Sequence, residues 1–224
     1  MKFINILLII LAVSMQIGCK TQVAETVTPV EESTVVPTKQ IPEVVADRIS
    51  LSWENTTEPH PERSPWSDKL VELFKQDFSL FISAKDLPEI CPKFATLSEV
   101  EQLKALGEFM VATAYFESGY NPKSEAVDVG TKSNKETWSV GLYQMSGTDS
   151  SAKAIGATYE KLKDPVVNIE VAMIQMKKQI TNRNAFFLNN SDSMRYWAVL
   201  LKGNKYSKIN EIKARVLKNA AFCK

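Results

Sequence analysis

One glutamate, Glu117, stands where a side chain could donate a proton to a substrate. Apolar and small residues at helical spacing, among them Leu106, Met110 and Thr113, run into it, so Glu117 continues the buried stripe of a predicted helix. Burial disfavours an unpaired carboxylate, and the negative end of the helix dipole near Gly119 acts in the same direction. A carboxyl group that stays partly protonated near neutral pH is what general-acid catalysis requires.

The alternative interpretation is a glutamate at a helix end that reaches solvent or pairs with Lys123. The residues that follow favour chemistry. Asn121-Pro122 comes directly after the helix end, and the run 139–145 (SVGLYQM) follows a polar loop. This run combines a glycine, which allows close approach of the backbone, with tyrosine and glutamine side chains that can form hydrogen bonds.

Three blocks of the sequence resemble a known family. E-S-G-Y-N-P at 117–122 and G-L-Y-Q-M at 141–145 resemble the lysozyme-like domain of the soluble lytic transglycosylase family. That family carries E-S-G-F/Y-N-P at a helix end, followed twenty-odd residues later by G-L-M/Y-Q. The block D-P-V-V-N-I at 164–169 resembles its D-P-x-x-N-I helix start. The resemblance covers residues 95–205, and three ordered blocks at this spacing make a specific signal.

The resemblance implies a fold and a reaction. The fold would be mainly α, a lysozyme-like helical domain with at most a small β-hairpin in the loop 120–145. The reaction would be cleavage of the β-1,4 bond between N-acetylmuramic acid and N-acetylglucosamine in peptidoglycan. Glu117 would act first as general acid and then as general base, giving a 1,6-anhydro sugar. The family's chemistry needs no cofactor and no metal ion.

The resemblance also implies which residues surround the glycan. Tyr143 and Gln144 would border the sugar subsite next to the cleaved bond, and Tyr196 would reach Glu117. Trp197 stands where the family carries an asparagine near the N-acetyl group, and this points to an altered sugar preference, such as glycan lacking some acetyl groups. The complete predicted substrate-binding set is Ser118, Asn121, Gly141, Leu142, Tyr143, Gln144, Met145, Tyr196 and Trp197.

A second carboxylate would change the reaction. Hydrolysis normally uses two acidic groups about 5 to 9 Å apart, and Glu125, Asp128, Glu136 and Asp149 are available without a readable relation to Glu117. The single-glutamate route is therefore preferred. One alternative is a lysozyme-type hydrolase in which Glu125, Asp128 or Glu136 positions water. Another is an inactive lysozyme-like domain that only binds wall glycan or a protein partner.

Several helices must position these residues. We expect helices at 67–82, 99–118, 165–181, 193–201 and 207–219, and one helical turn near 149–155. Ser98 and Glu101 form a capping box at the start of the second helix, and Asp164 with Pro165 begins the third. The segment 86–92, with two prolines, is a predicted connecting loop.

Other classes of function are excluded by composition. The formal net charge is +1, so the chain lacks the basic field that is typical of nucleic-acid-binding proteins. Its only histidine, His60, lies in a proline-rich stretch, which leaves serine-histidine and cysteine-histidine catalysis without a base and excludes His-based zinc sites. The predicted partner is the peptidoglycan glycan strand, bound by a monomer.

The N-terminal part of the chain predicts export. Residues 1–18 have a positive start and an apolar stretch too short to span a membrane, and are typical of a signal peptide. Ile17-Gly18-Cys19 resembles the end of a bacterial lipobox, so Cys19 would carry a lipid. We expect a periplasmic protein anchored to a bacterial membrane; the alternative is a plain cleaved signal and a secreted protein.

A flexible tether at 19–50, rich in Thr, Val, Glu and Pro, would precede a folded domain at 51–224. Cys91 and Cys223 remain once Cys19 is lipidated. In an oxidising compartment we expect them to form a disulfide; the alternative is two separate buried thiols.

Overall fold

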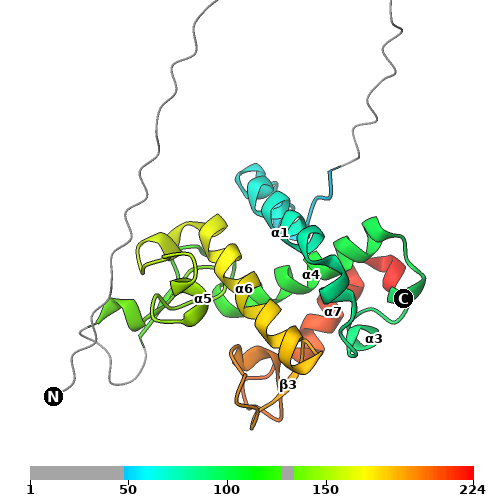
Figure 1. Cartoon of the computed structure of the whole chain (residues 1–224). Helices are drawn as coiled ribbons and strands as arrows, with labels where there is room; N and C mark the ends of the chain where they lie inside the picture. Colours follow the sequence, from blue (N-terminus) through cyan, green and yellow to red (C-terminus); the bar gives the residue numbers. More distant parts are fainter. Residues whose placement is uncertain (1–47, 128–133) are drawn as a thin grey trace, which may run out of the picture. The chain divides into compact units, whose positions relative to one another are not determined.

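The computed structural model describes residues 48–127 and 134–224, which belong to one compact unit spanning 45–224 (Figure 1). The predicted signal peptide, Cys19, most of the tether and Asp128 lie outside the described residues. The described chain starts to make specific contacts slightly before the predicted domain boundary, because Arg48 forms an ion pair with Glu54 at 2.9 Å. No helix in the described ranges is long and apolar enough to cross a membrane.

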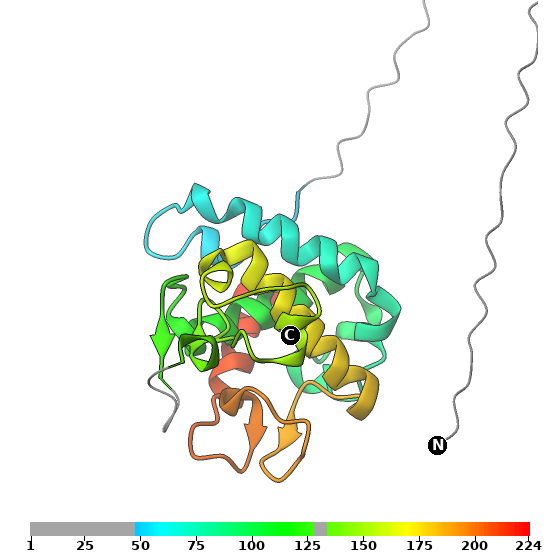
Figure 2. The ribbon, with the colours of Figure 1, turned by 60° about the vertical axis from the view of Figure 1, so that its left-hand side comes forward.

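Helix α4 (Glu99–Ser118) is the centre of this unit (Figures 1 and 2). The Ser98 side chain accepts from the backbone N–H of Glu101 while the Glu101 carboxylate accepts from that of Ser98, which confirms the predicted capping box. Residues 105–114 are buried without interruption, so this stretch has no solvent-facing side. Gly119 ends the helix in the left-handed conformation, with φ of 62°.

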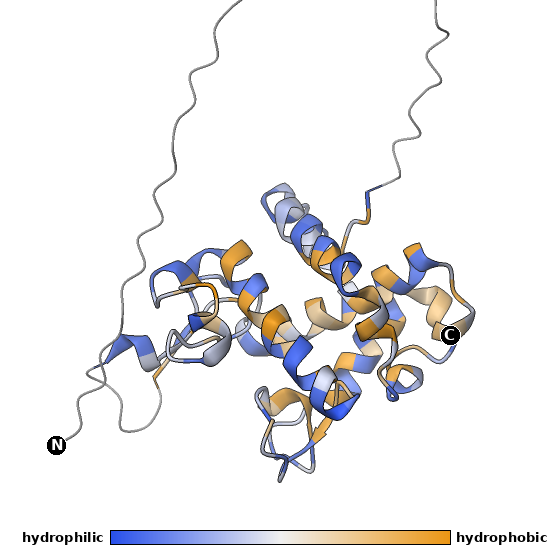
Figure 3. Ribbon diagram, in the orientation of Figure 1, coloured by the Kyte–Doolittle hydropathy of each residue, from blue (hydrophilic) through white to orange (hydrophobic). Residues whose placement is uncertain are grey.

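Two helices pack on α4, and a third packs on one of these two. Helix α1 (Ser64–Gln76) packs on α4 and on α6 (Pro165–Arg183), and α7 (Ile209–Asn219) packs on α4. The hydrophilic residues of these helices are blue and the hydrophobic residues are orange in Figure 3. Helix α6 begins as predicted, because the Asp164 side chain accepts from the N–H groups of Val166 and Val167 and Pro165 occupies the first turn.

The predicted helix 67–82 is broken in two by Asp77. Helix α1 ends at Gln76, and α2 (Phe78–Ile82) follows as a separate helix. Asp77 takes a non-helical backbone conformation, and its carboxylate pairs with Lys177 of α6 at 2.5 Å. The break lets Phe81 pack edge-to-face on Phe74 in the core, which a continuous helix pattern could not reveal.

Two small sheets flank the helices. Strands β1 (Glu125–Ala126) and β2 (Ser139–Val140) form the expected antiparallel hairpin. Strands β3 (Leu188–Asn189) and β4 (Leu201–Lys202) form a parallel pair that the sequence did not predict. The remaining short elements are α3 (Leu87–Ile90), α5 (Ser150–Lys153) and the 3-10 turns Ser52–Glu54, Pro61–Arg63, Phe94–Thr96, Lys135–Thr137, Lys161–Lys163, Ala198–Leu200 and Ala221–Cys223.

The predicted helix at 193–201 is wrong. Only the 3-10 turn Ala198–Leu200 forms there, because Leu201 and Lys202 pair with β3. Tyr196 and Trp197 also both reach the segment 143–149 through hydrogen bonds. A helix would turn adjacent side chains about 100° apart, so these tertiary contacts override the local pattern.

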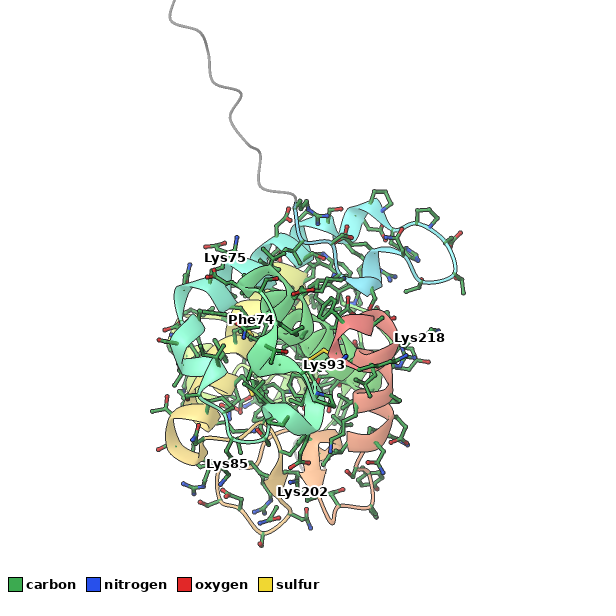
Figure 4. All side chains as sticks on the ribbon, turned by 90° about the vertical axis from the view of Figure 1, so that its right-hand side faces the viewer. Phe74, Lys75, Lys85, Lys93, Lys202 and Lys218 are labelled. Atoms are coloured by element: carbon green, nitrogen blue, oxygen red, sulfur yellow. A yellow bond between two sulfur atoms is a disulfide. The ribbon has the colours of Figure 1, made fainter. Side chains whose placement is uncertain are left out.

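The predicted disulfide between Cys91 and Cys223 is present and joins positions 132 residues apart (Figure 4). Cys91 follows α3, within the segment 86–92 that was expected to be a simple loop, and Cys223 lies in the last 3-10 turn. The bridge therefore fixes the C-terminus beside the segment that leads into α4.

Candidate active site

Glu117 lies on the last turn of α4 and lines a cavity of about 370 Å³. No residue in the described ranges forms a hydrogen bond with its half-buried carboxylate. Burial without a partner raises its pKa to about 7. The carboxyl group is therefore part protonated at neutral pH, as the sequence predicted for a general acid. The cavity is lined by Glu117, Thr137, Ser139, Gln144, Ser146, Thr148, Asp149, Tyr196, Trp197 and Ala198.

The turn formed by residues 141–145 faces Glu117 and is held in place by Asn168 of α6. Its buried side-chain amide donates to the carbonyls of Val140 at 2.8 Å and Leu162 at 3.0 Å, and its Oδ1 accepts from the N–H of Tyr143 at 2.8 Å. Gly141 sits against this amide with φ of 80°, and a Cβ there would be only 2.4 Å from Asn168 Nδ2. This contact explains why the blocks G-L-Y-Q and D-P-x-x-N occur together in one chain.

Two further hydrogen bonds attach the turn to the elements around it. Ser118 Oγ donates to the carbonyl of Leu142 at 2.9 Å, which couples the turn to the residue beside Glu117. Trp197 Nε1 donates to the carbonyl of Tyr143 at 2.9 Å. Ser118 and Trp197 were predicted to bind substrate; here each supports the turn, and Trp197, 2% exposed, also forms part of the cavity wall.

Gln144 is the residue of the turn whose side chain faces the cavity. Its backbone is left-handed, with φ of 51°. The side-chain amide donates to the carbonyls of Gly141 at 2.9 Å and Ser124 at 3.2 Å. Because both amide hydrogens are used, Gln144 can offer a ligand only the acceptor Oε1.

Six of the predicted substrate-binding residues, Ser118 among them, do not line the cavity. Gly141, Leu142, Tyr143 and Met145 are buried in the core, and the hydroxyl of Tyr143 has no hydrogen-bond partner among the described residues. The prediction that Tyr143 borders a sugar subsite is therefore corrected: hydrogen bonds with Asn168 hold the backbone of this turn so that Leu142, Tyr143 and Met145 lie in the core and Gln144 faces the cavity. Asn121 is exposed and its Oδ1 accepts from the N–H of Lys123, so it shapes the turn after α4.

Tyr196 lines the cavity but does not donate to Glu117. Its hydroxyl donates to Asp149 Oδ2, which also accepts from the N–H of Ser146 at 3.0 Å. Burial raises the pKa of Tyr196 far above its usual range, so this hydroxyl stays protonated and remains a donor. The cavity thus holds two carboxyl groups, Glu117 and Asp149.

Asp149 is the functional candidate that the sequence did not single out. It precedes the one-turn helix α5, where an aspartate normally caps the helix, yet its side chain makes no cap hydrogen bond. Its carboxylate accepts a hydrogen bond from Tyr196 instead.

The other predicted acids are engaged elsewhere. Glu125 pairs with Lys163 at 3.2 Å and accepts from the hydroxyl of Tyr159 at 2.5 Å, and hydrogen bonds from these groups lower its pKa. Glu136 accepts from the N–H of Tyr159 at 2.9 Å. Neither lines the cavity. In residues 48–127 and 134–224, no group of three or more His, Cys, Asp or Glu side chains could hold a metal ion.

Comparison with known proteins agrees with the predicted family. Residues 99–201 match the family model described as "Transglycosylase SLT domain". Two similar solved structures are the wild-type form 2 of Bd0314 DslA, with 20% identity and a TM-score of 0.63, and a glutamate-to-glutamine mutant of DslA, with 19% identity and a TM-score of 0.64. Each likeness covers 79% of this chain and 99% of the other chain, and at this identity it shows a shared fold. No curated protein matches the sequence.

Proposed function

We propose that this protein is a peptidoglycan lytic transglycosylase, a proposal supported by the match of residues 99–201 to the family model of the transglycosylase SLT domain. It cleaves the β-1,4 bond between N-acetylmuramic acid and N-acetylglucosamine, with Glu117 as the general acid and base. The observation that carries this proposal is the carboxyl group of Glu117, which lines the cavity without a hydrogen-bond partner among the described residues and whose pKa burial raises to about 7. A group with this pKa can both give and take a proton near neutral pH.

In the first step the protonated Glu117 donates its proton to the glycosidic oxygen. The bond between C1 of the muramic acid and that oxygen breaks, and the N-acetylglucosamine leaves as an alcohol. Positive charge develops at C1, where the oxygen of the neighbouring N-acetyl group can stabilise it. Glu117 is now a carboxylate, an anion close to the cationic sugar.

In the second step the Glu117 carboxylate removes the proton from the 6-hydroxyl of the muramic acid. O6 forms a bond to C1 and closes the 1,6-anhydro ring, and Glu117 returns to its protonated state. Each proton given in the first step is thus recovered in the second, and no water enters the product. The single raised-pKa carboxyl is sufficient for both transfers.

A specific observation favours hydrolysis as a second candidate function. Asp149 lines the same cavity as Glu117, and its Oδ2 already accepts two hydrogen bonds, which keep the carboxylate oriented. A second carboxylate could remove a proton from water that attacks C1, giving a reducing end. Asp149 is a better candidate for this role than Glu125 or Glu136, which are engaged outside the cavity.

The altered sugar preference is also a proposal. Trp197 donates its only side-chain N–H to the carbonyl of Tyr143 and cannot give it to an N-acetyl group. This supports a preference for glycan lacking some acetyl groups. A binding module without activity has no need of an unpaired carboxyl on a buried helix end, so Glu117 favours an enzyme over such a module.

Mass spectrometry of soluble fragments tests the function directly. The full-length mature protein is incubated with native and de-N-acetylated peptidoglycan. We expect fragments that end in 1,6-anhydromuramic acid, none from the Glu117→Gln variant, and retained binding of that variant to the wall. Reducing ends heavier by one water would identify a hydrolase. No release from either wall by the unchanged protein would contradict enzymatic function and leave a binding module.

We also propose that the protein is exported and anchored through a lipid on Cys19. Mass spectrometry of the mature N-terminus tests this: a diacylglyceryl group on Cys19 is the expected result. A mature chain that starts elsewhere, without a lipid mass, would instead indicate a plain cleaved signal and a secreted protein.

A further inference from the structure

A second pocket lies beside the end of α4, apart from the cavity that holds Glu117. It has a volume of about 330 Å³ and is bounded by the segment 52–57, the end of α4 and helix α7. The residues that carry its chemistry are Thr56, Thr57, Tyr115, Tyr120, Arg215 and Lys218. No acidic side chain lines it. Nothing in the proposed cleavage reaction uses this pocket.

Two cations of α7 face the pocket without an anionic partner in the described part of the chain. The guanidinium carbon of Arg215 lies 3.4 Å from the centroid of the Tyr115 ring. This cation–π contact holds the guanidinium at the pocket, where its N–H groups can bind a carboxylate through two hydrogen bonds. Lys218, three residues later on the same helix, is exposed and is drawn at the surface in Figure 4.

Tyr120 adds an unpartnered donor to the pocket. The residue is 7% exposed, and its hydroxyl has no hydrogen-bond partner among the described residues. Its φ of 67° is rare for a residue with a side chain, and it follows Gly119, which is also left-handed. Burial raises the pKa of Tyr120 to about 12, so the hydroxyl stays protonated. The predicted family pattern accepts phenylalanine at this position, so the turn itself does not require the hydroxyl.

The nearest buried carboxylate does not compete for these cations. Glu108 of α4 is 1% exposed and lies beneath the pocket, where Ser52, Lys104 and Asn219 donate to it. Its ion pair with Lys104, at 2.9 Å, balances its charge. The field in the pocket therefore remains positive.

The C-terminal segment, whose surface includes Arg215 and Lys218, is basic in composition. Residues 177–224 contain eleven Lys and Arg against two Asp and Glu, an asymmetry that the overall net charge of +1 conceals. A surface of this kind raises the local concentration of an anionic ligand. The pocket has positive charge, hydroxyl donors and an aromatic wall, which together suit a carboxylate carried on an extended chain.

We infer that this pocket binds a carboxylate of the peptide side chain of peptidoglycan while the glycan lies in the cavity of Glu117. The inference rests on the proposed function. Tyr115 is two residues before Glu117 on α4, so the two sites lie on different sides of one helix end. A helix is about 10 to 12 Å across, and a peptide of about four residues spans up to roughly 13 to 14 Å. A stem peptide attached to the muramic acid is therefore long enough to cross straight over the end of the helix, where Gly119 is exposed.

Binding by the full-length Glu117→Gln variant tests this pocket without catalysis. The probes are a disaccharide that carries a stem tetrapeptide and the same disaccharide without peptide. We expect Arg215→Ala or Lys218→Ala to weaken binding of the peptide-bearing probe about ten-fold, with no change for the peptide-free probe. Arg215→Lys should recover only part of the affinity, and Tyr120→Phe should weaken binding with the ring kept in place. Lys205→Ala, which removes an exposed lysine of the same basic segment outside the pocket, is the matched control.

Several results would overturn the inference. Unchanged binding in both Arg215→Ala and Lys218→Ala, or an equal loss for both probes, would show that the pocket does not bind the peptide. Binding of inorganic phosphate or acetate in the pocket as tight as that of the peptide-bearing probe would mean a general anion site. If the protein with Glu117 intact fails to cleave any wall, the proposed function fails, and the two-probe binding comparison still decides whether the pocket recognises the peptide.

Discussion

The hydroxyl of Tyr196 donates to the carboxylate of Asp149 in the same cavity that Glu117 lines. The two carboxyl groups thus have different surroundings. Asp149 accepts hydrogen bonds from Tyr196 and from the backbone of Ser146, whereas Glu117 receives none from the described residues and has its pKa raised by burial. Carboxyl groups in different environments at one site can take different roles, one as proton donor and one as stabilising anion.

The first prediction concerns Asp149. In the transglycosylase route Asp149 transfers no proton and only stabilises positive charge on the sugar, so we expect Asp149→Asn to lower the rate about ten-fold with 1,6-anhydro ends unchanged. The measurement is the rate of fragment release combined with mass spectrometry of the ends. Glu125→Gln, which changes an acid outside the cavity, should leave both unaffected. A loss of 100-fold or more, with reducing ends from the unchanged protein, would assign Asp149 as the base of a hydrolase.

The second prediction concerns the glycine of the turn. Gly141→Ala places a Cβ 2.4 Å from Asn168 Nδ2 and 2.6 Å from the carbonyl of Leu162, at a φ of 80°. We expect a loss of about 2 to 4 kcal/mol in the free energy of unfolding and loss of activity, because the turn that faces Glu117 must move. Urea unfolding and fragment release measure the two effects.

Gly156→Ala is its matched control. Gly156 has a φ of 62° but nothing within 4 Å of the added Cβ, so only backbone strain of about 1 kcal/mol is expected, with activity retained. Equal losses in both variants would show that φ alone, and not the contact with Asn168, makes glycine necessary at Gly141.

The sequence predicted those parts of the fold that local signals determine. The capping box at Ser98, the N-cap at Asp164 and the helix ends at Gly119 are local patterns, and the structure has them. The split of 67–82 at Asp77 and the absence of a helix at 193–201 depend on partners distant in sequence, Lys177 and strand β3. Periodicity in one segment carries no information about such partners.

The same distinction between local signals and contacts distant in sequence applies to the residues of the site. Glu117 could be identified because its position on a buried helix face is itself a local anomaly. Tyr143 and Asp149 could not be placed, because the direction of each side chain is set by a residue in another element, Asn168 for the turn and Tyr196 for the carboxylate. The motif marked the turn correctly but not which of its side chains face the cavity.

The third prediction concerns the disulfide. Cys91 and Cys223 close a loop of 132 residues, so replacing both with serine should lower the free energy of unfolding by about 2 to 5 kcal/mol, chiefly by freeing the unfolded chain. The bridge is remote in sequence from the turn and from Asp149, so activity at low temperature should persist. Thermal unfolding with and without reductant measures the effect. No change on reduction of the unchanged protein would mean that the packing of α3 and α7 already fixes the C-terminus.

The fourth prediction is the pH dependence of cleavage. The general acid must be protonated in the free enzyme, and Glu117 loses its proton as pH rises through about 7. We therefore expect kcat/KM to be highest below pH 7 and to fall about ten-fold for each pH unit above it. A profile that falls with an apparent pKa near 4.5 would show that Glu117 is solvated and does not act as this acid.

The fifth prediction links the same pKa to stability. Between the usual value of 4.5 and about 7, the folded protein holds a proton on Glu117 that the unfolded chain releases, so this residue makes the fold less stable as pH rises through that window. Glu117→Gln removes the penalty, and we expect it to raise the free energy of unfolding by about 1 to 3 kcal/mol at pH 8 and by little at pH 4. Urea unfolding of both forms at the two pH values measures this. An equal change in the free energy of unfolding at both pH values would mean that the substitution acts through packing. An increase confined to pH 8 would show that the ionised carboxylate of Glu117 destabilises the fold.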